Sequence, residues 1–310
     1  MKINLANIKK AKNLLNKSEC VAIPTETVYG LAGNAYSNQA CRKIFRLKRR
    51  PKNNPLIVHY YDLKKATKDC ILNDDFLKLY KKLSPGPITF ILKLKKDSKI
   101  SKIATNKKNT LAIRFPKHPV TRSLLKKLKF PIAAPSANIS SRVSAVTAND
   151  VKDDFGKRIK YILEGGRSNI GIESTIIDLR KNPKILRLGG LDIDDIKKIL
   201  GKKILININP AKVSAPGQFK THYSPGIPIR LNVKKIKKDE AYLMVSRKKI
   251  NKANYYFLSK KGNLREAAKN LYSTLRRIKK NKYKSIAVSK IPNKGLGKTI
   301  NDRLLRASKF

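Results

Sequence analysis

The stretch NQACRKIFRLKRRPKNNPLIVHY, residues 38–60, decides the fold because it passes from a helix through a basic corner into a buried strand. Residues 38–48 have inward-facing apolar side chains at helical spacing: Cys41, Ile44, Phe45 and Leu47. The apolar run PLIVHY (55–60) is typical of a buried strand. A helix followed by such a strand predicts an α/β fold, and the corner between them lies where these folds usually bind ligands.

Short strands and amphipathic helices continue on both sides of this stretch. Apolar runs predict strands at CVAIPT (20–25), ITFILKL (88–94), TLAIRFP (110–116), PIAA (131–134), YIL (161–163), STIIDL (174–179) and ILRL (185–188). Helical spacing is found over residues 1–15, 118–130 and 192–200. Thr147 and Asp150 form a capping-box signature, and Gly201 suits a left-handed helix end.

A linker and a second domain follow. Residues 209–228 contain four prolines and two glycines and show neither helical nor strand periodicity. Beyond them, AYLMVS (241–246), YYFLS (255–259) and SIAVSKI (285–291) predict strands, and residues 264–280 and 298–308 predict helices. We therefore expect a large domain at 1–208, a linker at 209–228 and a small α/β domain at 229–310.

The charge balance points to anionic partners. The chain has 72 Lys and Arg against 20 Asp and Glu, a formal net charge of +52. This charge attracts polyanions and favours nucleotides or RNA as partners. The alternative is that the lysines only cover solvated faces, because they are spread along the whole chain, as in KNLLNK, KKLKF and RRIKKNKYK, as coding bias could produce.

Cysteine usage and the first residues predict a reduced, cytoplasmic setting. Cys20, Cys41 and Cys70 cannot all pair within the chain, and no Cys or His spacing suggests a metal cage. The start of the chain lacks the apolar stretch of a secretory signal, and its Lys and Asn disfavour a mitochondrial presequence. No run approaches the ~20 apolar residues of a membrane span.

The basic corner Lys48-Arg49-Arg50 is the first candidate for a phosphate site. Arginine offers a planar fork and lysine a mobile point charge, a pair suited to an α-phosphate under attack. Alone, however, such a triplet in a basic chain is more often a solvated helix end.

Other segments offer polar groups near predicted strand ends. Ser136 and Asn138 can bond one ligand from alternate positions, although a simple turn explains them too. Residues 164–175 resemble a phosphate cradle, because Gly165 and Gly166 permit close backbone approach and the hydroxyls of Ser174 and Thr175 follow. Thr25 and Thr27 also offer hydroxyls, in what is equally a Pro-bounded turn.

The tripeptide Gly297-Lys298-Thr299 resembles the end of a Walker A loop. The leading glycine of that motif is missing, because Pro292 stands there and has no N–H to give a phosphate. The sequence therefore does not favour a P-loop.

Six segments, taken in order, resemble the YrdC/Sua5 family of threonylcarbamoyl-AMP synthases. They are PTETVYGL (24–31), LKRRPKNNPLIVH (47–59), LAIRFP (111–116), APSANIS (134–140), ESTIID (173–178) and LRLG (186–189). Each is weak alone, but the ordered set is specific. SAPGQFKTHYSPG (214–226) and GLGKTINDRLLRAS (295–308) resemble the long Sua5 branch, so the resemblance covers essentially the entire chain.

The resemblance implies a YrdC-like twisted open α/β domain with a large positive cleft, a small Rossmann-like α/β domain, and a linker lying over the cleft. It implies a nucleotidyltransferase that combines L-threonine, bicarbonate or CO2, and ATP into threonylcarbamoyl-adenylate and pyrophosphate. This is the first step toward N6-threonylcarbamoyladenosine at tRNA position 37, and a separate transferase takes the product. Mg²⁺ is expected to arrive with the nucleotide phosphates.

The family's site positions carry over residue by residue, with Lys48 and Arg50 as the catalytic cations. The nucleotide side comprises Lys48, Arg50, Asn54, Thr110, Ser136, Asn138, Ser144, Arg187 and Tyr223. The threonine side comprises Thr27, His59, Arg114, Ala134 and Ser174. Arg114 suits this role because a guanidinium can hold a carboxylate in a bidentate manner.

We expect the carbamate of threonine to attack the α-phosphate while Lys48 and Arg50 stabilise the developing charge, without a covalent enzyme intermediate. Tyr223 is expected to close over the site and exclude water, unless it only packs the linker down. Two departures from the family, Arg49 and the segment Ile139-Ser140-Ser141, fall where glycine is common and restrict loop flexibility.

Two rival functions use the same residues differently. One is an RNA-binding module on a basic cleft, with weak direct RNA binding, although no RRM-type aromatic signature supports sequence reading. The other is carbamoyl-adenylate chemistry of the kind found in hydrogenase maturation proteins. The missing zinc-finger and acylphosphatase-like segments argue against it.

Overall fold

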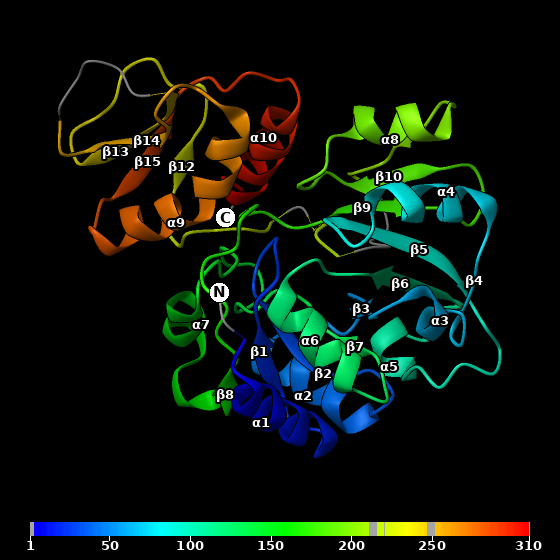
Figure 1. The fold of residues 1–310 in the computed structure, drawn as a ribbon. Helices are drawn as coiled ribbons and strands as arrows, with labels where there is room; N and C mark the ends of the chain where they lie inside the picture. Colours follow the sequence, from blue (N-terminus) through cyan, green and yellow to red (C-terminus); the bar gives the residue numbers. More distant parts are fainter. Residues whose placement is uncertain (1–2, 211–215, 220, 247–251, 310) are drawn as a thin grey trace.

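The computed structural model describes residues 3–210, 216–219, 221–246 and 252–309, which form two α/β domains (Figure 1). The helices are α1 Leu5–Asn16, α2 Asn38–Lys48, α3 Leu63–Ala66, α4 Asp74–Leu83, α5 Lys102–Thr105, α6 Pro119–Lys127, α7 Ala148–Phe155, α8 Ile193–Leu200, α9 Leu264–Lys280 and α10 Leu296–Ala307. A 3-10 turn at Gly156–Arg158 follows α7.

The first domain contains strands β1 Val21–Ile23, β2 Gly30–Asn34, β3 Ile57–His59, β4 Cys70–Ile71, β5 Ile88–Leu94, β6 Thr110–Arg114, β7 Ile132–Ala133, β8 Tyr161–Ile162, β9 Thr175–Asp178, β10 Lys184–Arg187 and β11 Leu205–Ile206. The second contains β12 Ile229–Arg230, β13 Glu240–Ser246, β14 Tyr255–Ser259 and β15 Ser285–Val288.

The strands of the first domain form one mixed sheet in the order β11-β10-β9-β5-β6-β3-β7-β2-β1-β8, with β4 beside β5. Because β3 and β6 run parallel, their carboxyl ends meet at one edge, where His59 lies opposite Arg114. Strand β5 runs antiparallel to β6 and parallel to β9, so both begin at this same edge. Four strand termini therefore lie together at this edge of the sheet: the ends of β3 and β6 and the starts of β5 and β9.

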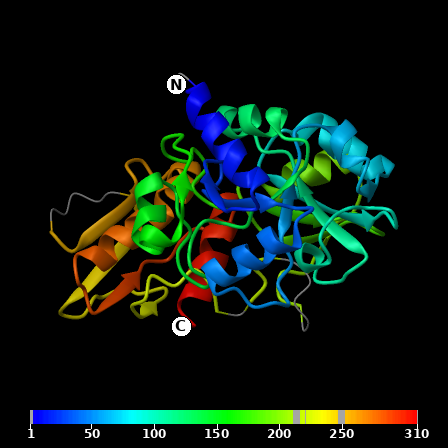
Figure 2. The same cartoon turned by 90° about the horizontal axis from the view of Figure 1, so that it is seen from below.

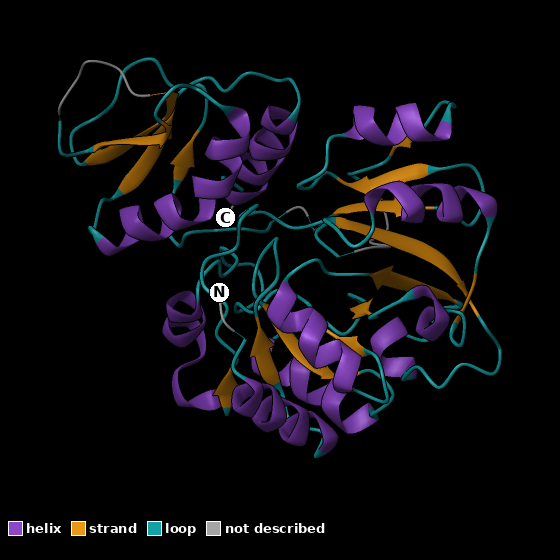
Figure 3. Ribbon diagram, in the orientation of Figure 1, coloured by secondary structure: helices purple, strands orange, loops and turns teal. Residues whose placement is uncertain are grey.

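The second domain has a four-stranded parallel sheet in the order β12-β15-β13-β14. Helix α9 connects β14 to β15, which lie on opposite sides of β13 and run parallel to it. Parallel strands of one sheet require a crossover connection of this kind. Helices α9 and α10 lie side by side next to this sheet (Figures 1 and 3). Figure 2 shows α10 running between the two domains, so this helix can contact both.

Most predicted elements are confirmed. Helices α2 and α9 have the predicted bounds, the capping box of Thr147 and Asp150 is present, and Gly201 is left-handed. Strand β2 was missed because GLAGN has two glycines and little β propensity; pairing with β1 and β7 on either side stabilises it. Leu47 is half-buried, and the buried C-terminal position of α2 is Lys48.

Both departures from the family's glycine positions fall on left-handed backbone. Arg49 has φ 50° and ψ 44°, and Ser141 has φ 67°. Non-glycine residues adopt this region at some cost, which is the physical reason that glycine suits such positions. The left-handed Arg49 ends α2 and turns its own side chain to solvent, while Lys48 stays inside.

No helix in the described ranges is long and apolar enough to cross a membrane.

Candidate functional site

Two adjoining cavities lie at the sheet edge where β3, β6, β5 and β9 converge. The walls of the inner cavity include Arg50, Arg114 and Arg187. The side cavity is lined by Lys48, Arg50, Asn54, Ser136 and Asn138, among others. Arg50, Ser136 and His222 belong to both walls, so the cavities form one site.

The end of α2 delivers two cations to the point where the cavities join. The Lys48 ammonium donates to the carbonyl oxygens of Ser136 at 2.6 Å and Asn138 at 2.5 Å. Arg50 donates to the carbonyls of Asn54 at 3.0 Å and Pro55 at 2.9 Å. The basic corner is therefore a fixed structure and not a solvated helix end.

Burial makes both cations receptive to an anion. Burial, with the nearby Arg50 cation, lowers the pKa of Lys48 well below its ordinary value. Burial and the Arg187 cation lower the pKa of Arg50 to about 9, so it stays protonated at neutral pH. A phosphate group placed between these cations would reverse both shifts, because an opposite charge favours the protonated form.

Arg114, at the end of β6, forms a buried ion pair. Its Nη2 lies 2.7 Å from Glu26 Oε1, and both side chains are almost completely buried. The backbone N–H of Lys117 also donates to Glu26 at 3.0 Å, which fixes the carboxylate. Glu26 therefore orients one nitrogen of Arg114 and leaves the rest of the guanidinium facing the cavity that Arg114 lines.

Glu173, just before β9, is a buried carboxylate shared by both domains. Ser144 donates to it at 2.6 Å, Tyr272 of α9 at 2.8 Å, and Arg303 of α10 at 3.0 Å. Burial alone would raise its pKa, but the cations Arg303 and Arg187 outweigh burial and lower the pKa of Glu173 to about 2. Glu173 is thus an anion at all ordinary pH values and is compensated by the second domain.

Residues of the linker line the inner cavity. Pro216, Gly217, His222 and Tyr223 all line it, and Tyr223 is only 1% exposed. The Tyr223 ring stacks on Tyr272 with centroids 5.9 Å apart, and the Arg303 guanidinium lies 4.6 Å from its centroid. The described linker residues Pro216, Gly217, His222 and Tyr223 are therefore part of the cavity wall.

Several buried polar atoms of the cavity walls have no hydrogen-bond partner within the described part of the chain. They are Asn54 Oδ1, His59 Nδ1, Arg114 Nε, Asn138 Oδ1, His222 Nδ1 and the Tyr223 hydroxyl. Buried polar groups are normally paired, because an unpaired one costs about 1–3 kcal/mol. Such a concentration of unpaired donors and acceptors around one space indicates a ligand site.

The structure brings most of the predicted site residues together. The lining of the two cavities includes Lys48, Arg50, Asn54, His59, Arg114, Ala134, Ser136, Asn138, Ser174, Arg187 and Tyr223. Ser144 lies one contact away, through Glu173. Thr27 bonds Thr25 instead, and Thr110 lies at the opposite end of β6 from Arg114, so neither lines the two cavities.

Sequence reasoning missed Glu173, His222, Tyr272 and Arg303 as parts of the site. Glu173 stands in the quoted segment 173–178 and His222 next to Tyr223, so both had a local signal. Arg303 stands in the quoted segment 295–308, but nothing there linked it to this site. Tyr272 had no signal, and both residues come from helices of the other domain. The Gly297-Lys298-Thr299 tripeptide lies within α10, where Thr299 donates to the Gly189 carbonyl at 3.1 Å, which agrees with its rejection as a P-loop.

The buried histidines predict a pH dependence of stability. Burial and the Arg114 cation lower the pKa of His59 to about 3, and burial, outweighing the attraction of Glu173, lowers that of His222 to about 3. Below about pH 6.5 these histidines bind protons in the unfolded chain but not in the folded chain. The free energy of unfolding therefore falls as pH falls. The expected slope is about 1.4 kcal/mol per pH unit for each histidine.

Urea unfolding between pH 7 and pH 5 measures this slope. The variant carrying His59→Gln and His222→Gln should have a clearly smaller slope, with a remainder from His118, whose pKa burial also lowers. An unchanged slope in that variant would refute the assignment.

Together, the fold and the site define a two-domain α/β protein with a buried cationic cavity for an anionic small molecule. The family described as Telomere recombination, which groups Sua5, YciO and YrdC proteins, matches residues 13–189, and the threonylcarbamoyl-AMP synthase C-terminal domain matches residues 191–309. The chain therefore belongs to the YrdC/Sua5 family, in its two-domain Sua5 branch.

Two named relatives are similar to this chain over nearly its full length. The threonylcarbamoyl-AMP synthases of Pyrococcus abyssi and Bacillus subtilis are each 34% identical, over 98% of this chain and 94% of theirs. The crystal structure of P. abyssi Sua5 complexed with L-threonine has a TM-score of 0.91 and 30% identity, covering 100% of this chain and 96% of that one.

Proposed function

We propose that this chain is an L-threonylcarbamoyladenylate synthase, which joins L-threonine, bicarbonate or CO2, and ATP, and releases pyrophosphate. The observation that carries the proposal is the set of buried cations and unpaired polar atoms around the joined cavities. Relatives of nearly equal length bear the name of this activity, and the P. abyssi structure contains L-threonine. Both facts favour ATP and threonine as substrates.

We place the nucleotide phosphates where α2 ends. Lys48, Arg50, Asn54, Ser136 and Asn138 would hold them, with Arg187 and Tyr223 on the nucleotide side. Ser144 would act through Glu173, and Thr110 would act from outside the cavity walls, at the far end of β6. Lys48 and Arg50 can compensate phosphate charge without moving, because neighbouring carbonyls already hold both. Donors that need no reorganisation stabilise a transition state most effectively.

We place threonine at the inner end of the cavity. Arg114, already oriented by Glu26, would bind the carboxylate, and His59, Ala134 and Ser174 would surround the rest. Thr27 would act from behind the cavity wall, through its hydrogen bond to Thr25. The Ser174 hydroxyl is fixed by Thr89 at 2.7 Å and by Arg187 at 3.0 Å. A side chain held from two sides is well suited to recognise a small polar substrate.

In the proposed reaction, an oxygen of threonine's carbamate forms a bond to the α-phosphorus of ATP as the bond to the pyrophosphate oxygen breaks. Lys48 and Arg50 stabilise the charge that develops on the phosphate oxygens. Tyr223 and His222 cover the cavity and limit access of water to the mixed anhydride. No nucleophile of the protein takes part.

The remaining partners are part of the same proposal. In the described part of the chain, no group of three His, Cys, Asp or Glu side chains could hold a metal, so Mg²⁺ would come bound to the nucleotide. The product would serve a separate tRNA threonylcarbamoyl transferase. We place the protein in the cytoplasm, in keeping with three buried free cysteines.

Pyrophosphate release from ATP tests the enzyme against the RNA-binding alternative. We expect release that needs both threonine and bicarbonate. If the wild-type protein released no pyrophosphate, the proposed enzyme function would be refuted. RNA affinity that weakens with salt but survives Lys48→Ala and Arg50→Ala would indicate a diffuse basic surface separate from the cavity.

A further inference from the structure

Thr89, on β5, is a buried residue behind the wall of the inner cavity. Its side chain is 0% exposed, and its Oγ1 lies 2.7 Å from the Oγ of Ser174, which lines the cavity. Strand register places Thr89 opposite Arg114 of β6, on the same face of the sheet. Thr89 therefore lies beside the proposed carboxylate site, at a position where the sequence predicted only a strand.

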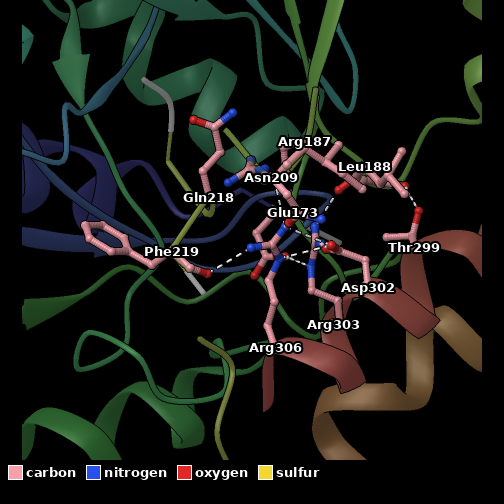
Figure 4. A network of polar contacts seen from close by, with 12 residues as sticks. Glu173, Arg187, Leu188, Asn209, Gln218, Phe219, Thr299, Asp302, Arg303 and Arg306 are labelled. Atoms are coloured by element: carbon pink, nitrogen blue, oxygen red, sulfur yellow. Dashed lines mark hydrogen bonds and ion pairs between the residues drawn. The ribbon is translucent and has the colours of Figure 1, made fainter. Parts of the chain in front are cut away.

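Ser174, just before β9, lies between Arg114 and Arg187. The sheet has the strand order β10-β9-β5-β6 at this place. Arg187 of β10 donates to the Ser174 hydroxyl from Nη2 and to the Ser174 carbonyl from Nε, each at 3.0 Å. Figure 4 shows Arg187 in one network of polar contacts with Glu173, the residue before Ser174. Across this edge of the sheet, from β6 to β10, the order is therefore Arg114, Thr89, Ser174 and Arg187.

The partners of the Thr89 hydroxyl fix the direction of its hydrogen bond. Within the described part of the chain, this hydroxyl has one hydrogen-bond partner, the hydroxyl of Ser174. If Thr89 did not donate its proton to Ser174, a completely buried donor would be left unpaired, which is costly. Thr89 is therefore the donor of this bond, and Ser174 is the acceptor.

Ser174 then keeps its own proton for a ligand. A serine hydroxyl has two acceptor lone pairs and one O–H donor. Thr89 and Arg187 both donate to its oxygen, so both lone pairs are occupied. The O–H of Ser174 is left for a group in the cavity that Ser174 lines. That group has to be a hydrogen-bond acceptor.

We propose that Thr89 is a positioning residue that fixes the Ser174 hydroxyl as a donor to the carboxyl group that bicarbonate or CO2 contributes. This inference rests on the proposed function. The protonated amine of threonine has no acceptor, so it cannot take this place. The carbamate has two acceptor oxygens, and it points from threonine toward the α-phosphate that it attacks. Ser174 lies between Arg114 and Arg187, the residues that we assign to these two ends.

The hydroxyl of threonine is a second acceptor on the substrate, and kinetics separates it from the carbamate. A contact with the oxygens that come from bicarbonate acts on KM for bicarbonate. A contact with the threonine hydroxyl acts on KM for threonine instead. The two constants are measured separately, each with the other substrates at saturation.

The test compares Thr89→Val with Thr89→Ser in the full-length chain. Valine keeps the branched shape of threonine without the hydroxyl, whereas serine keeps the hydroxyl. Initial rates of pyrophosphate release are measured in CO2-depleted buffer with added bicarbonate. For Thr89→Val we expect KM for bicarbonate to rise about five- to tenfold, the effect of weakening one buried hydrogen bond. We expect KM for threonine to stay within about twofold, and Thr89→Ser to stay within about twofold for both constants.

Thr105→Val is the matched control. Thr105 of α5 is 3% exposed and its hydroxyl donates to the Lys102 carbonyl at 3.3 Å, but it lines neither cavity. The same substitution thus removes a buried hydroxyl away from the site, and both KM values should stay within about twofold. Melting temperatures of all three variants separate a kinetic effect from a loss of folded protein.

Unchanged kinetics in Thr89→Val would overturn the proposal, and so would an equal rise of KM for bicarbonate in Thr105→Val. A rise confined to KM for threonine would also overturn it, because Ser174 would then donate to the threonine hydroxyl. These results refute the inference alone, since they require an active wild type. If the wild type released no pyrophosphate, the proposed function would fail, and this inference would fail with it.

Discussion

Replacing Lys48 with methionine is expected to lower kcat for threonine-dependent pyrophosphate release by about 10²-fold or more. The Nζ of Lys48 is held at 2.6 Å and 2.5 Å from the carbonyls of Ser136 and Asn138, at the wall of the side cavity. Removing one fixed donor to developing charge typically costs about 2.7–4 kcal/mol in the transition state. Since we assign Lys48 to the α-phosphate, the loss should appear in kcat more than in KM for threonine.

Lys65 provides the control. Its Nζ also donates to two carbonyls, those of Leu125 at 3.1 Å and Leu128 at 2.9 Å, but on α3 and away from both cavities. Lys65→Met should keep kcat within about twofold while losing a similar pair of hydrogen bonds, from a half-buried lysine. If Lys48→Met retained full activity, Lys48 would be a structural lysine and our assignment of the phosphate position would be wrong.

Replacing Arg114 with methionine is expected to raise KM for threonine by about 10- to 100-fold. A charge-assisted hydrogen bond is worth about 1.5–3 kcal/mol, and each 1.4 kcal/mol is about a factor of ten. KM for ATP should change much less, because Arg114 lies at the end of β6, opposite His59 on β3, on the proposed threonine side. Initial rates over a threonine titration at saturating ATP measure the effect.

Arg114→Met also leaves Glu26 without its cation, so stability has to be measured separately. Arg230→Met is the comparison variant, because the partly exposed Arg230 pairs with the buried Glu240 at 2.6 Å in the second domain. We expect Arg230→Met to lower the melting temperature and leave KM for threonine unchanged. A normal threonine KM in Arg114→Met would place the carboxylate elsewhere.

The sequence predicted those helices and strands that a local pattern of neighbouring residues determines. The apolar face of residues 264–280 and the Thr147–Asp150 capping box required no knowledge of distant residues, and both are present. Strand β2 required such knowledge, because its backbone is held by neighbours that the sequence of residues 30–34 does not encode. Its two glycines suggest a loop when considered alone.

The site residues also differ in how far the sequence alone could identify them. Lys48 and Arg50 stand two positions apart in sequence, and the ordered set of segments around them identified both. Glu173 and Arg303, in contrast, are 130 residues apart and meet only because α10 returns to the first domain. A lone glutamate and a lone arginine in a chain with 72 basic residues give no sign of such a pair. Contacts between domains are the part of this site that a single sequence does not reveal.

Identification of the reaction product tests whether this chain makes threonylcarbamoyl-adenylate. The purified chain is incubated with ATP, L-threonine and ¹³C-labelled bicarbonate, and the nucleotide product is identified by mass spectrometry. We predict an adenylate that contains threonine and is heavier by the labelled carbamoyl carbon, formed in step with pyrophosphate. Pyrophosphate without that product, or an adenylate that lacks the label, would contradict the account.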